Sequence, residues 1–294
     1  MAAALEGLRI GFVGAGRLGR ALAWSLAGRG LAVAAAASHR RASAEALAAR
    51  VEGCLVLDAQ AVVDACDLVF VTTPDAAIAA TVAGLRWRDG VAVMHCSGVT
   101  EVAALDAAKS QGALAGGFHP MQTFGDPEAA ARSLPGCTIT VEAPEPLDAL
   151  LVALAERLQC RVNRLPPGMR ARYHAAAGYT SQFVNVLFAE AARLWAAWGA
   201  SEAQAVEALL PLARGTLAAI GAAGIARAMP GPVSRGDLGS NEKHLAALAP
   251  MGEDTLALYR ALCRATVPLA LERGAIDEAC ARRFEALLKA PAAG

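Results

Sequence analysis

Residues 8–19 read LRIGFVGAGRLG, an apolar run followed at once by glycines at positions 14, 16 and 19. A buried strand that leads into Gly-x-Gly-x-x-Gly is typical of a dinucleotide-binding turn. The first glycine permits the tight turn, the second lets the backbone approach a pyrophosphate, and the third lets the next helix pack on the strand. The pattern therefore predicts that the cofactor-binding turn consists of Gly14, Ala15, Gly16, Arg17, Leu18 and Gly19.

The sequence around this turn supports the prediction, because in a chain with 28 glycines the spacing alone also arises by chance. An Ala/Leu/Trp-rich segment follows the turn, Gly28-Arg29-Gly30 ends that segment, and a second apolar run covers 31–37. This succession predicts a strand, a helix and a second strand, which together form a β-α-β unit.

The end of the second predicted strand indicates which dinucleotide binds. Ser38, 19 residues beyond Gly19, stands where an NAD site places an acidic residue against the ribose 2′-hydroxyl, and His39, Arg40 and Arg41 follow it. Arginine donates paired charge-assisted hydrogen bonds to phosphate oxygens, so a hydroxyl and two guanidinium groups suit a 2′-phosphate. NADP(H) is therefore the predicted cofactor. The alternative is that both arginines are solvated charges at a strand-to-helix turn.

Composition narrows the class of protein. Of 294 residues, 55% are hydrophobic and 18% are charged, so the chain is long enough for two packed domains and is not disordered. No run of 18 apolar residues occurs and residues 1–7 lack the features of a secretory signal, so we expect a cytoplasmic protein without a transmembrane helix. Lysine and arginine (27) balance aspartate and glutamate (27), which argues against nucleic acid and favours a small-molecule substrate.

The seven cysteines form no Cys-x-x-Cys pair, and no histidine lies at metal-ligand spacing from them, apart from the adjacent His95 and Cys96. We therefore expect reduced core thiols and no metal site. A catalytic thiol at Cys96, which ends a predicted strand, is the alternative.

Further strand-like runs cover 54–56, 68–72, 91–94, 114–118 and 137–141, and helical segments separate most of them. This alternation predicts an α/β fold, a Rossmann domain of residues 1–165 whose mostly parallel sheet has helices on both faces. Such sheets bind ligands at the carboxyl ends of their strands. We therefore expect Thr72, Thr73, Pro74 and Ser97 in the cofactor site, His119 beside it, and a cofactor-side role for His95.

The pattern changes at Pro166-Pro167-Gly168, after which residues 166–294 are predicted to form an all-α domain. Long helices are expected over 169–198 and 202–223. The first has apolar residues on more than one face, which predicts that a second copy of the chain covers it in a homodimer. A Pro/Gly-rich loop at 229–237 then precedes a helix through His244, and this loop is a candidate site.

Several of these motifs occur together in one known family. They are the fingerprint at 14–19, Pro74-Asp75, His95-Cys96-Ser97-Gly98, HPMQTF at 119–124, YHAAA at 173–177, and Gly231-Pro232 to Arg235-Gly236-Asp237 with His244. In this ordered set the chain resembles the bacterial Rossmann-like family with a C-terminal helical domain of unknown function, whose members are labelled NADP oxidoreductases. That family is similar in architecture to pyrroline-5-carboxylate reductase, ketopantoate reductase and the deazaflavin-dependent NADP reductases.

The resemblance implies hydride transfer at a cleft between the two domains. Two departures are visible. Ser181-Gln182 stands where the resemblance predicts Ser-Asn, and the lysine-based catalytic pattern of ketopantoate reductase is not found in this helix.

Reduction of a C=O or C=N group by NADPH needs a proton donor and an anchor for the substrate. His119 is the expected acid, because an unperturbed imidazole pKa of about 6.5 suits proton transfer; the alternative is a structural histidine. Arg235 would bind a substrate carboxylate, while Asp237 would cap the next helix and orient His244. The alternative for this group is a salt-bridged loop anchor.

The sequence thus predicts an NADP(H)-dependent oxidoreductase of a small, anionic carbonyl, imine or hydroxy-acid substrate. A redox-sensing protein that binds NADP(H) without catalysis is the alternative, because fold alone does not decide function. A paralogue without a cofactor would require the three glycines to be accidental.

Overall fold

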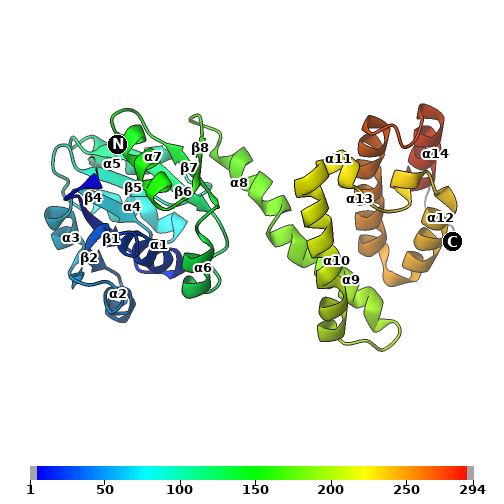
Figure 1. Ribbon diagram of the computed structural model, residues 1–294, viewed down its shortest axis with the longest axis horizontal. Helices are drawn as coiled ribbons and strands as arrows, with labels where there is room; N and C mark the ends of the chain where they lie inside the picture. The colour runs from blue at the N-terminus through cyan, green and yellow to red at the C-terminus, as the bar shows by residue number, and fades with distance from the viewer. Residues whose placement is uncertain (1–4, 290–294) are drawn as a thin grey trace. The chain divides into compact units, whose positions relative to one another are not determined.

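The computed structural model describes residues 5–289, and the chain divides into two compact units, Met1–Ser181 and Gln182–Gly294 (Figure 1). Residues 1–4 and 290–294, the outer ends of the two predicted domains, lie outside the described residues. The first unit is an α/β domain and the second is helical, as the sequence predicts. The division falls after the predicted boundary at 165/166, so that one more helix belongs to the first unit.

An eight-stranded sheet forms the centre of the first unit. Its strands are β1 (Arg9–Val13), β2 (Ala32–Ala37), β3 (Leu55–Val56), β4 (Leu68–Val71), β5 (Ala92–His95), β6 (Leu114–Met121), β7 (Thr138–Glu142) and β8 (Arg161–Arg164). They lie in the order β3-β2-β1-β4-β5-β6-β7-β8, and all neighbours are parallel except β6 and β7. The seven predicted strands are present. The polar edge strand β8 is an addition that no apolar pattern predicts.

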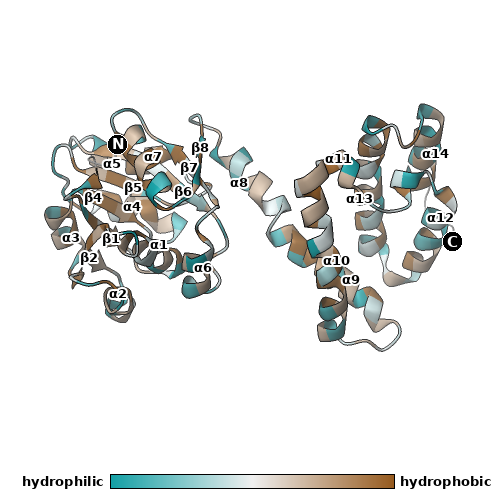
Figure 2. Ribbon diagram, viewed as in Figure 1, coloured by the Kyte–Doolittle hydropathy of each residue, from teal (hydrophilic) through white to brown (hydrophobic). Residues whose placement is uncertain are grey.

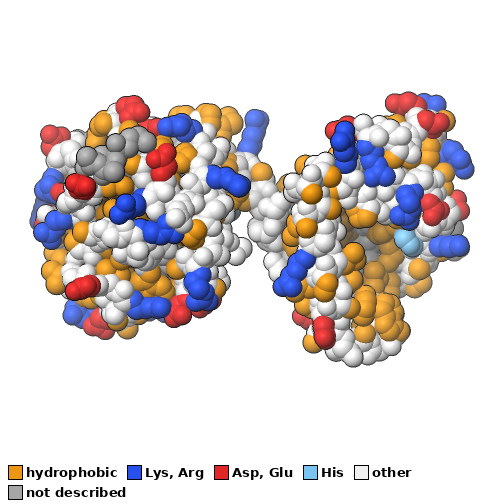
Figure 3. Space-filling view, viewed as in Figure 1, with side chains coloured by type: hydrophobic (Ala, Val, Ile, Leu, Met, Phe, Trp, Pro, Cys, Tyr) orange, Lys and Arg blue, Asp and Glu red, His pale blue; other side chains and the backbone are white. Residues whose placement is uncertain are grey.

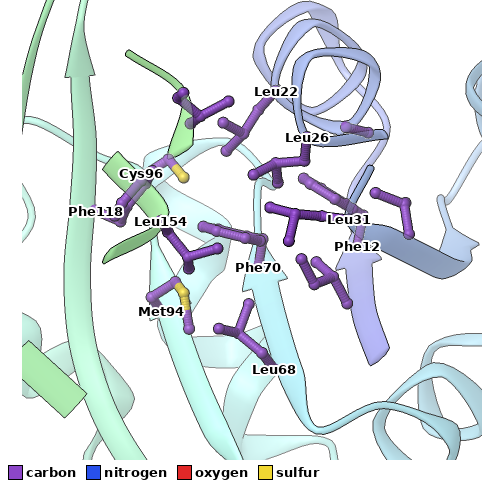
Figure 4. Close-up of a cluster of buried hydrophobic side chains, with 14 of the residues drawn as sticks. Phe12, Leu22, Leu26, Leu31, Leu68, Phe70, Met94, Cys96, Phe118 and Leu154 are labelled. Atoms are coloured by element: carbon purple, nitrogen blue, oxygen red, sulfur yellow. The ribbon is translucent and has the colours of Figure 1, made fainter. Parts of the chain in front are cut away.

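Helices cover both faces of this sheet. Those of the first unit are α1 (Arg17–Ala27), α2 (Arg41–Ala48), α3 (Ala59–Ala65), α4 (Ile78–Ala83), α5 (Asp106–Lys109), α6 (Pro127–Ser133), α7 (Leu147–Arg157) and α8 (Arg170–Tyr179). Because side chains alternate along a strand, Phe12, Phe70 and Phe118 share one face, where they pack against α1 and α7 (Figure 4). Val13 of β1 and Val69 and Val71 of β4 pack on the other face against α3, α4 and α5.

The strand order creates a crevice at one edge of the sheet. The chain leaves β1 toward β2 on one side, while β4 lies on the other side of β1. Open α/β sheets bind ligands at this reversal of strand order, outside the carboxyl ends of the strands. The turn between β1 and α1 therefore stands at the expected place.

The helix predicted over 169–198 is interrupted, so the prediction of one continuous helix is wrong. Helix α8 ends at Tyr179 and α9 begins at Gln182. The hydroxyl groups of Thr180 and Ser181 both donate to the carbonyl of Ala177, at 3.2 and 2.7 Å. Such side-chain bonds to the preceding turn compete with the helical backbone bonds.

The second unit is entirely helical in its described residues. Its helices are α9 (Gln182–Ala196), α10 (Glu202–Ala223), α11 (Ile225–Ala228), α12 (Leu238–Leu248), α13 (Glu253–Glu272) and α14 (Glu278–Lys289). A small core forms where α13 and α14 pack on each other, with Val267 and Phe284 among its members. None of the α9 residues is buried, and Ala205 is the one buried residue of α10.

Candidate functional site

A cleft of about 960 Å³ lies over the turn between β1 and α1. Nine of the thirteen predicted cofactor residues line this cleft. They are Gly14, Ala15, Gly16, Arg17, Ser38, Arg40, Thr72, Thr73 and Pro74. The folded chain thus brings the glycine turn, the end of β2 and the end of β4 to one place.

The geometry of the turn fits a phosphate-bearing ligand. A Cβ atom on Gly14, whose φ is +108°, would lie 2.6 Å from the Thr72 carbonyl, whereas one on Gly16 would meet nothing within 4 Å. The backbone at Gly16 is therefore open to close approach. Helix α1 begins there without a side-chain cap and without an acidic residue in its first turn, so its free amides and positive dipole end favour an anion.

Four predicted cofactor residues lie elsewhere. Gly19 packs against Thr72, and Leu18 packs against the core. Arg41 forms an ion pair of 2.9 Å with Glu45, one turn further along α2. The Ser97 hydroxyl accepts from the Thr100 amide at 3.0 Å and so closes the turn after β5. Arg41 and Ser97 thus have partners within the protein and do not line this cleft, and their part in cofactor binding stays a prediction.

The cleft also contains charged residues that sequence reasoning missed. Arg20 lines it one helical turn after Gly16, and a search for cations on the same face of α1 as Arg17 would have found it. Asp58 lines it at the start of α3, where its carboxylate accepts from the Ala61 amide at 2.8 Å. Arg17, Arg20 and Arg40 together make the cleft cationic.

A second polar cluster lies at the carboxyl end of β5 and beside β6, where α8 joins them. The hydroxyl of Tyr173 on α8 lies 2.6 Å from Nδ1 of His119 on β6. A Cβ atom on Gly98 would lie 3.0 Å from Nε2 of His119, so this nitrogen faces the turn after β5. The His174 ring is 6.4 Å from that of His119. Tyr173 and His174 belong to a motif noted in the sequence, but their proximity to His119 was not predicted from it.

A buried ion pair holds α8 against the sheet. Arg170 is fully buried, and its Nε donates to Oε2 of Glu142 on β7 at 2.5 Å. Its Nη1 donates to the Ser97 carbonyl at 2.7 Å. Arg170 therefore connects α8 with the ends of β5 and β7, and both ionic partners were missed from the sequence.

Burial changes the protonation expected of both histidines. Burial, followed by the nearby His174 and Arg170, lowers the pKa of His119 to about 4. Burial and Arg170 lower the pKa of His95 to about 3. His119 thus does not have the ordinary pKa assumed from the sequence, and the fold favours its neutral ring; its role as the acid stays a prediction. His95 is fully buried and accepts from the Ser97 amide at 3.2 Å, which is a structural role.

The thiol of Cys96 does not belong to this cluster. It lies among the apolar side chains of the core (Figure 4), and burial raises its pKa. The thiolate that a nucleophile requires is disfavoured there.

The predicted residues of the second unit are only partly connected. Asp237 accepts from the Ser240 amide at 3.0 Å, so it caps α12 as expected. It does not orient His244, whose Nδ1 instead lies 2.7 Å from the Tyr259 hydroxyl. Arg235 is exposed at the end of a short 3-10 turn and forms no ion pair with any residue in the described range 5–289. The loop is anchored by Arg273, which donates to the Ser234 carbonyl at 2.8 Å.

Helices α9 and α10 expose an apolar face (Figures 2 and 3). Its large exposed side chains are Phe183, Val184, Val186, Leu187, Val206, Leu210, Leu212, Leu217 and Ile220, and Trp198 is exposed in the turn between the two helices. A groove of about 750 Å³ runs between the two helices. Among the described residues, α10 is also the one helix long and apolar enough to cross a membrane, by length and composition only. The sequence pattern did not predict this property of α10.

Both parts of the chain match models of known protein families. Residues 3–120 match the Rossmann-like domain family, and residues 137–266 match a domain of unknown function, DUF2520. The chain thus has a Rossmann-like domain followed by a mainly helical domain of unknown function, as its resemblance implied. A comparison with curated proteins gave no match.

Solved structures share this architecture. A Bacteroides fragilis protein, classed as an NADP oxidoreductase without a named substrate, is 27% identical with a TM-score of 0.71, over 90% of this chain and 99% of that one. A Thermotoga maritima protein is 22% identical with a TM-score of 0.72 over the same shares. A reductive aminase of Aspergillus terreus in complex with NADPH4, cyclohexanone and allyl amine is 16% identical, with a TM-score of 0.65 over 95% and 99%.

Gly117→Ala should destabilise the first unit. A Cβ atom at this position of β6 would overlap Nη2 of the buried Arg170. Overpacking of this kind costs about 1–3 kcal/mol. Urea denaturation measures it, with Gly125→Ala as the matched control because a Cβ there meets nothing within 4 Å. Equal stability of the two variants would contradict the described position of Arg170.

The free energy of unfolding should also decrease as the pH is lowered, and part of this decrease should depend on His119. The imidazole takes up a proton near pH 6.5 in the unfolded chain but only near pH 4 in the folded one. The unfolded state then binds more protons between these values, so this stability is complete above pH 6.5 and is lost as pH falls toward 4.

Calorimetry at pH 7 and pH 5 tests the size of this effect. His119→Ala should lose less stability than wild type between the two values, by on the order of 1–2 kcal/mol after allowance for partial exposure. The same change at the exposed His39 should leave the wild-type loss unaltered. Identical losses in wild type and His119→Ala would show that His119 is not held neutral by the fold.

Proposed function

We propose that this protein is an NADP(H)-dependent oxidoreductase that transfers a hydride to or from a small carbonyl, imine or hydroxy-acid substrate. One observation supports it most: the cationic cleft at the glycine turn and the His119 cluster stand at the carboxyl ends of strands of one sheet. In doubly wound sheets a dinucleotide extends across this edge, so its reactive ring would lie on the side of β4 and β5. The likeness to the Bacteroides fragilis protein agrees with this class.

The residues of the chain would have distinct roles. The amides at Gly16 and the guanidinium groups of Arg17 and Arg20 would bind the pyrophosphate, and Ser38 and Arg40 would bind the 2′-phosphate. The bound cofactor supplies the hydride. His119, which is neutral, would donate a hydrogen bond from Nε2 to the substrate oxygen or nitrogen, as neutral imidazoles do in other enzymes that polarise a carbonyl. Arg235 remains the proposed anchor for a substrate carboxylate. Asp237 would keep its capping role at α12, and His244 contacts Tyr259 instead of Asp237.

One observation favours the alternative, a protein that senses NADP(H) without catalysis. The low pKa of His119 removes the ionised acid that a reductase often uses. A screen of NADPH oxidation against 2-oxo acids, cyclic imines and 2-ketopantoate-like compounds separates the two functions.

Turnover of any of these compounds, with a lower kcat in His119→Ala and a higher KM in Arg235→Ala, would support the reductase. NADPH binding without turnover of any compound would support the sensor.

We further propose a cytoplasmic location, because the seven cysteines are all free in the structure.

NADPH should bind more tightly than NADH, and the two neighbouring arginines should differ. Arg40 lines the cleft, whereas Arg41 is paired with Glu45. Arg40→Ala should weaken NADPH binding by about 1.5–3 kcal/mol, the value of a charged hydrogen bond, and should barely change NADH binding.

Fluorescence titration measures this preference, and Arg41→Ala is the matched control that should retain it. Equal affinity of wild type for the two dinucleotides would refute the 2′-phosphate site. Equal losses in the two variants would refute the assignment to Arg40.

We also propose a homodimer built on the apolar face of α9 and α10. Because Ala205 is the one buried residue of these two helices, they gain little packing energy within the unit, and so large a set of exposed apolar side chains marks an interaction surface. Light scattering should give twice the monomer mass at micromolar concentration. Leu217→Glu, at a residue 66% exposed, should shift the protein to monomer without unfolding it. A wild-type monomer, or wild-type binding to lipid vesicles, would contradict the dimer.

A further inference from the structure

A chain of hydrogen-bonding groups runs from the edge strand of the first unit to His119. The Asn163 side chain on β8 donates from Nδ2 to the Thr140 hydroxyl oxygen on β7 at 3.2 Å. Thr140 is fully buried and lies opposite His119 in the antiparallel pairing of β6 and β7. The Thr140 hydroxyl lies near the Tyr173 hydroxyl and can donate to it, and the Tyr173 oxygen lies 2.6 Å from Nδ1 of His119.

The chemistry of these groups gives the chain a direction. An amide nitrogen only donates, so Thr140 accepts from Asn163 and has its single proton left for Tyr173. With Thr140 as its donor, Tyr173 has its own proton left for Nδ1 of His119, 2.6 Å away. A neutral imidazole that accepts at Nδ1 carries its hydrogen at Nε2. That nitrogen faces the turn at Gly98.

We propose that Tyr173 is a positioning residue that holds His119 in the Nε2–H tautomer, so that the ring presents a hydrogen-bond donor at the end of β5. The consequence for catalysis rests on the proposed function: a donor at Nε2 stabilises negative charge on a substrate oxygen or nitrogen, whereas the opposite tautomer would present a lone pair. Tyr173 does this through His119 and need not touch the substrate.

The groups around His119 agree with a neutral ring. Arg170 and His174 face it from α8, and His95 is near it from β5. Glu142 on β7 is already paired with Arg170, so among these neighbours no free carboxylate favours the imidazolium. The tautomer, and not the charge, is then the property that a neighbour can set.

Long-range ¹⁵N–¹H correlation spectra of the labelled protein test this directly, because the two tautomers give different nitrogen patterns. The chain has five histidines, and the His119 signals are those missing from His119→Ala. Wild type should show the Nε2–H tautomer. Tyr173→Phe should give a mixture of tautomers, and Thr140→Val should weaken the preference while Tyr173 remains. Tyr179→Phe, the same change at a residue of α8 that is 73% exposed, should keep the wild-type pattern.

Turnover provides the second measurement. With a substrate from the screen, Tyr173→Phe should lower kcat on the order of 10-fold or more, a fraction of what a positioned proton donor contributes, with an unchanged KM for NADPH. An Nδ1–H tautomer in wild type, or an Nε2–H tautomer unchanged in a folded Tyr173→Phe, would overturn the inference. Absence of turnover on every compound would overturn the proposed function alone, because the spectra need no substrate.

Discussion

The buried ion pair between Arg170 and Glu142 is the contact on which the candidate site depends. Removing two charges from water costs several kcal/mol each, and loss of one partner from a buried pair costs about 3–5 kcal/mol because the other charge is left uncompensated. Here the cost is offset by a bond of 2.5 Å and by the further bond to the Ser97 carbonyl. Because Arg170 is the first residue of α8, the pair fixes the start of that helix at the sheet edge.

Several features of the first unit follow from this anchor. β6 has a glycine at position 117 because a side chain there would occupy the space of the guanidinium group. Tyr173, one turn further along α8, reaches His119. The positive charge of Arg170 adds to burial in keeping both His95 and His119 neutral. This one ion pair thus fixes the start of α8, requires a glycine at position 117 and helps to keep the two histidines neutral.

The sequence predicts those parts of the site that are local in the chain. The glycine turn lies within six residues and each glycine has its own steric role, so the cleft at Gly14 and Gly16 was accessible to reasoning from sequence. Polar residues after apolar runs located the ends of β4 and β5 for the same reason, whereas β6 continues through His119 to Met121. The alternation of apolar runs was sufficient for the Rossmann-like sheet and for the helical second unit.

Contacts that depend on tertiary pairing were not accessible. Glu142 and Arg170 are 28 residues apart, and they meet because β7 runs antiparallel to β6. The hydrophobic periodicity of the sequence does not indicate that Thr140 lies opposite His119. Nor does it indicate that Arg41 pairs with Glu45 while its neighbour Arg40 lines the cleft. The ordinary pKa expected for His119 failed for the same reason, since burial is a property of the folded unit.

The proposed function requires the reaction centre to lie beside α8, at the carboxyl end of β5 and next to His119 on β6. A crystal structure of the protein with NADP and a carbonyl analogue of a substrate found in the screen tests it most directly. The account predicts the nicotinamide at the carboxyl end of β5 and the analogue's oxygen about 3 Å from Nε2 of His119. An analogue bound away from His119, with Nε2 bonded to a protein carbonyl instead, would contradict it.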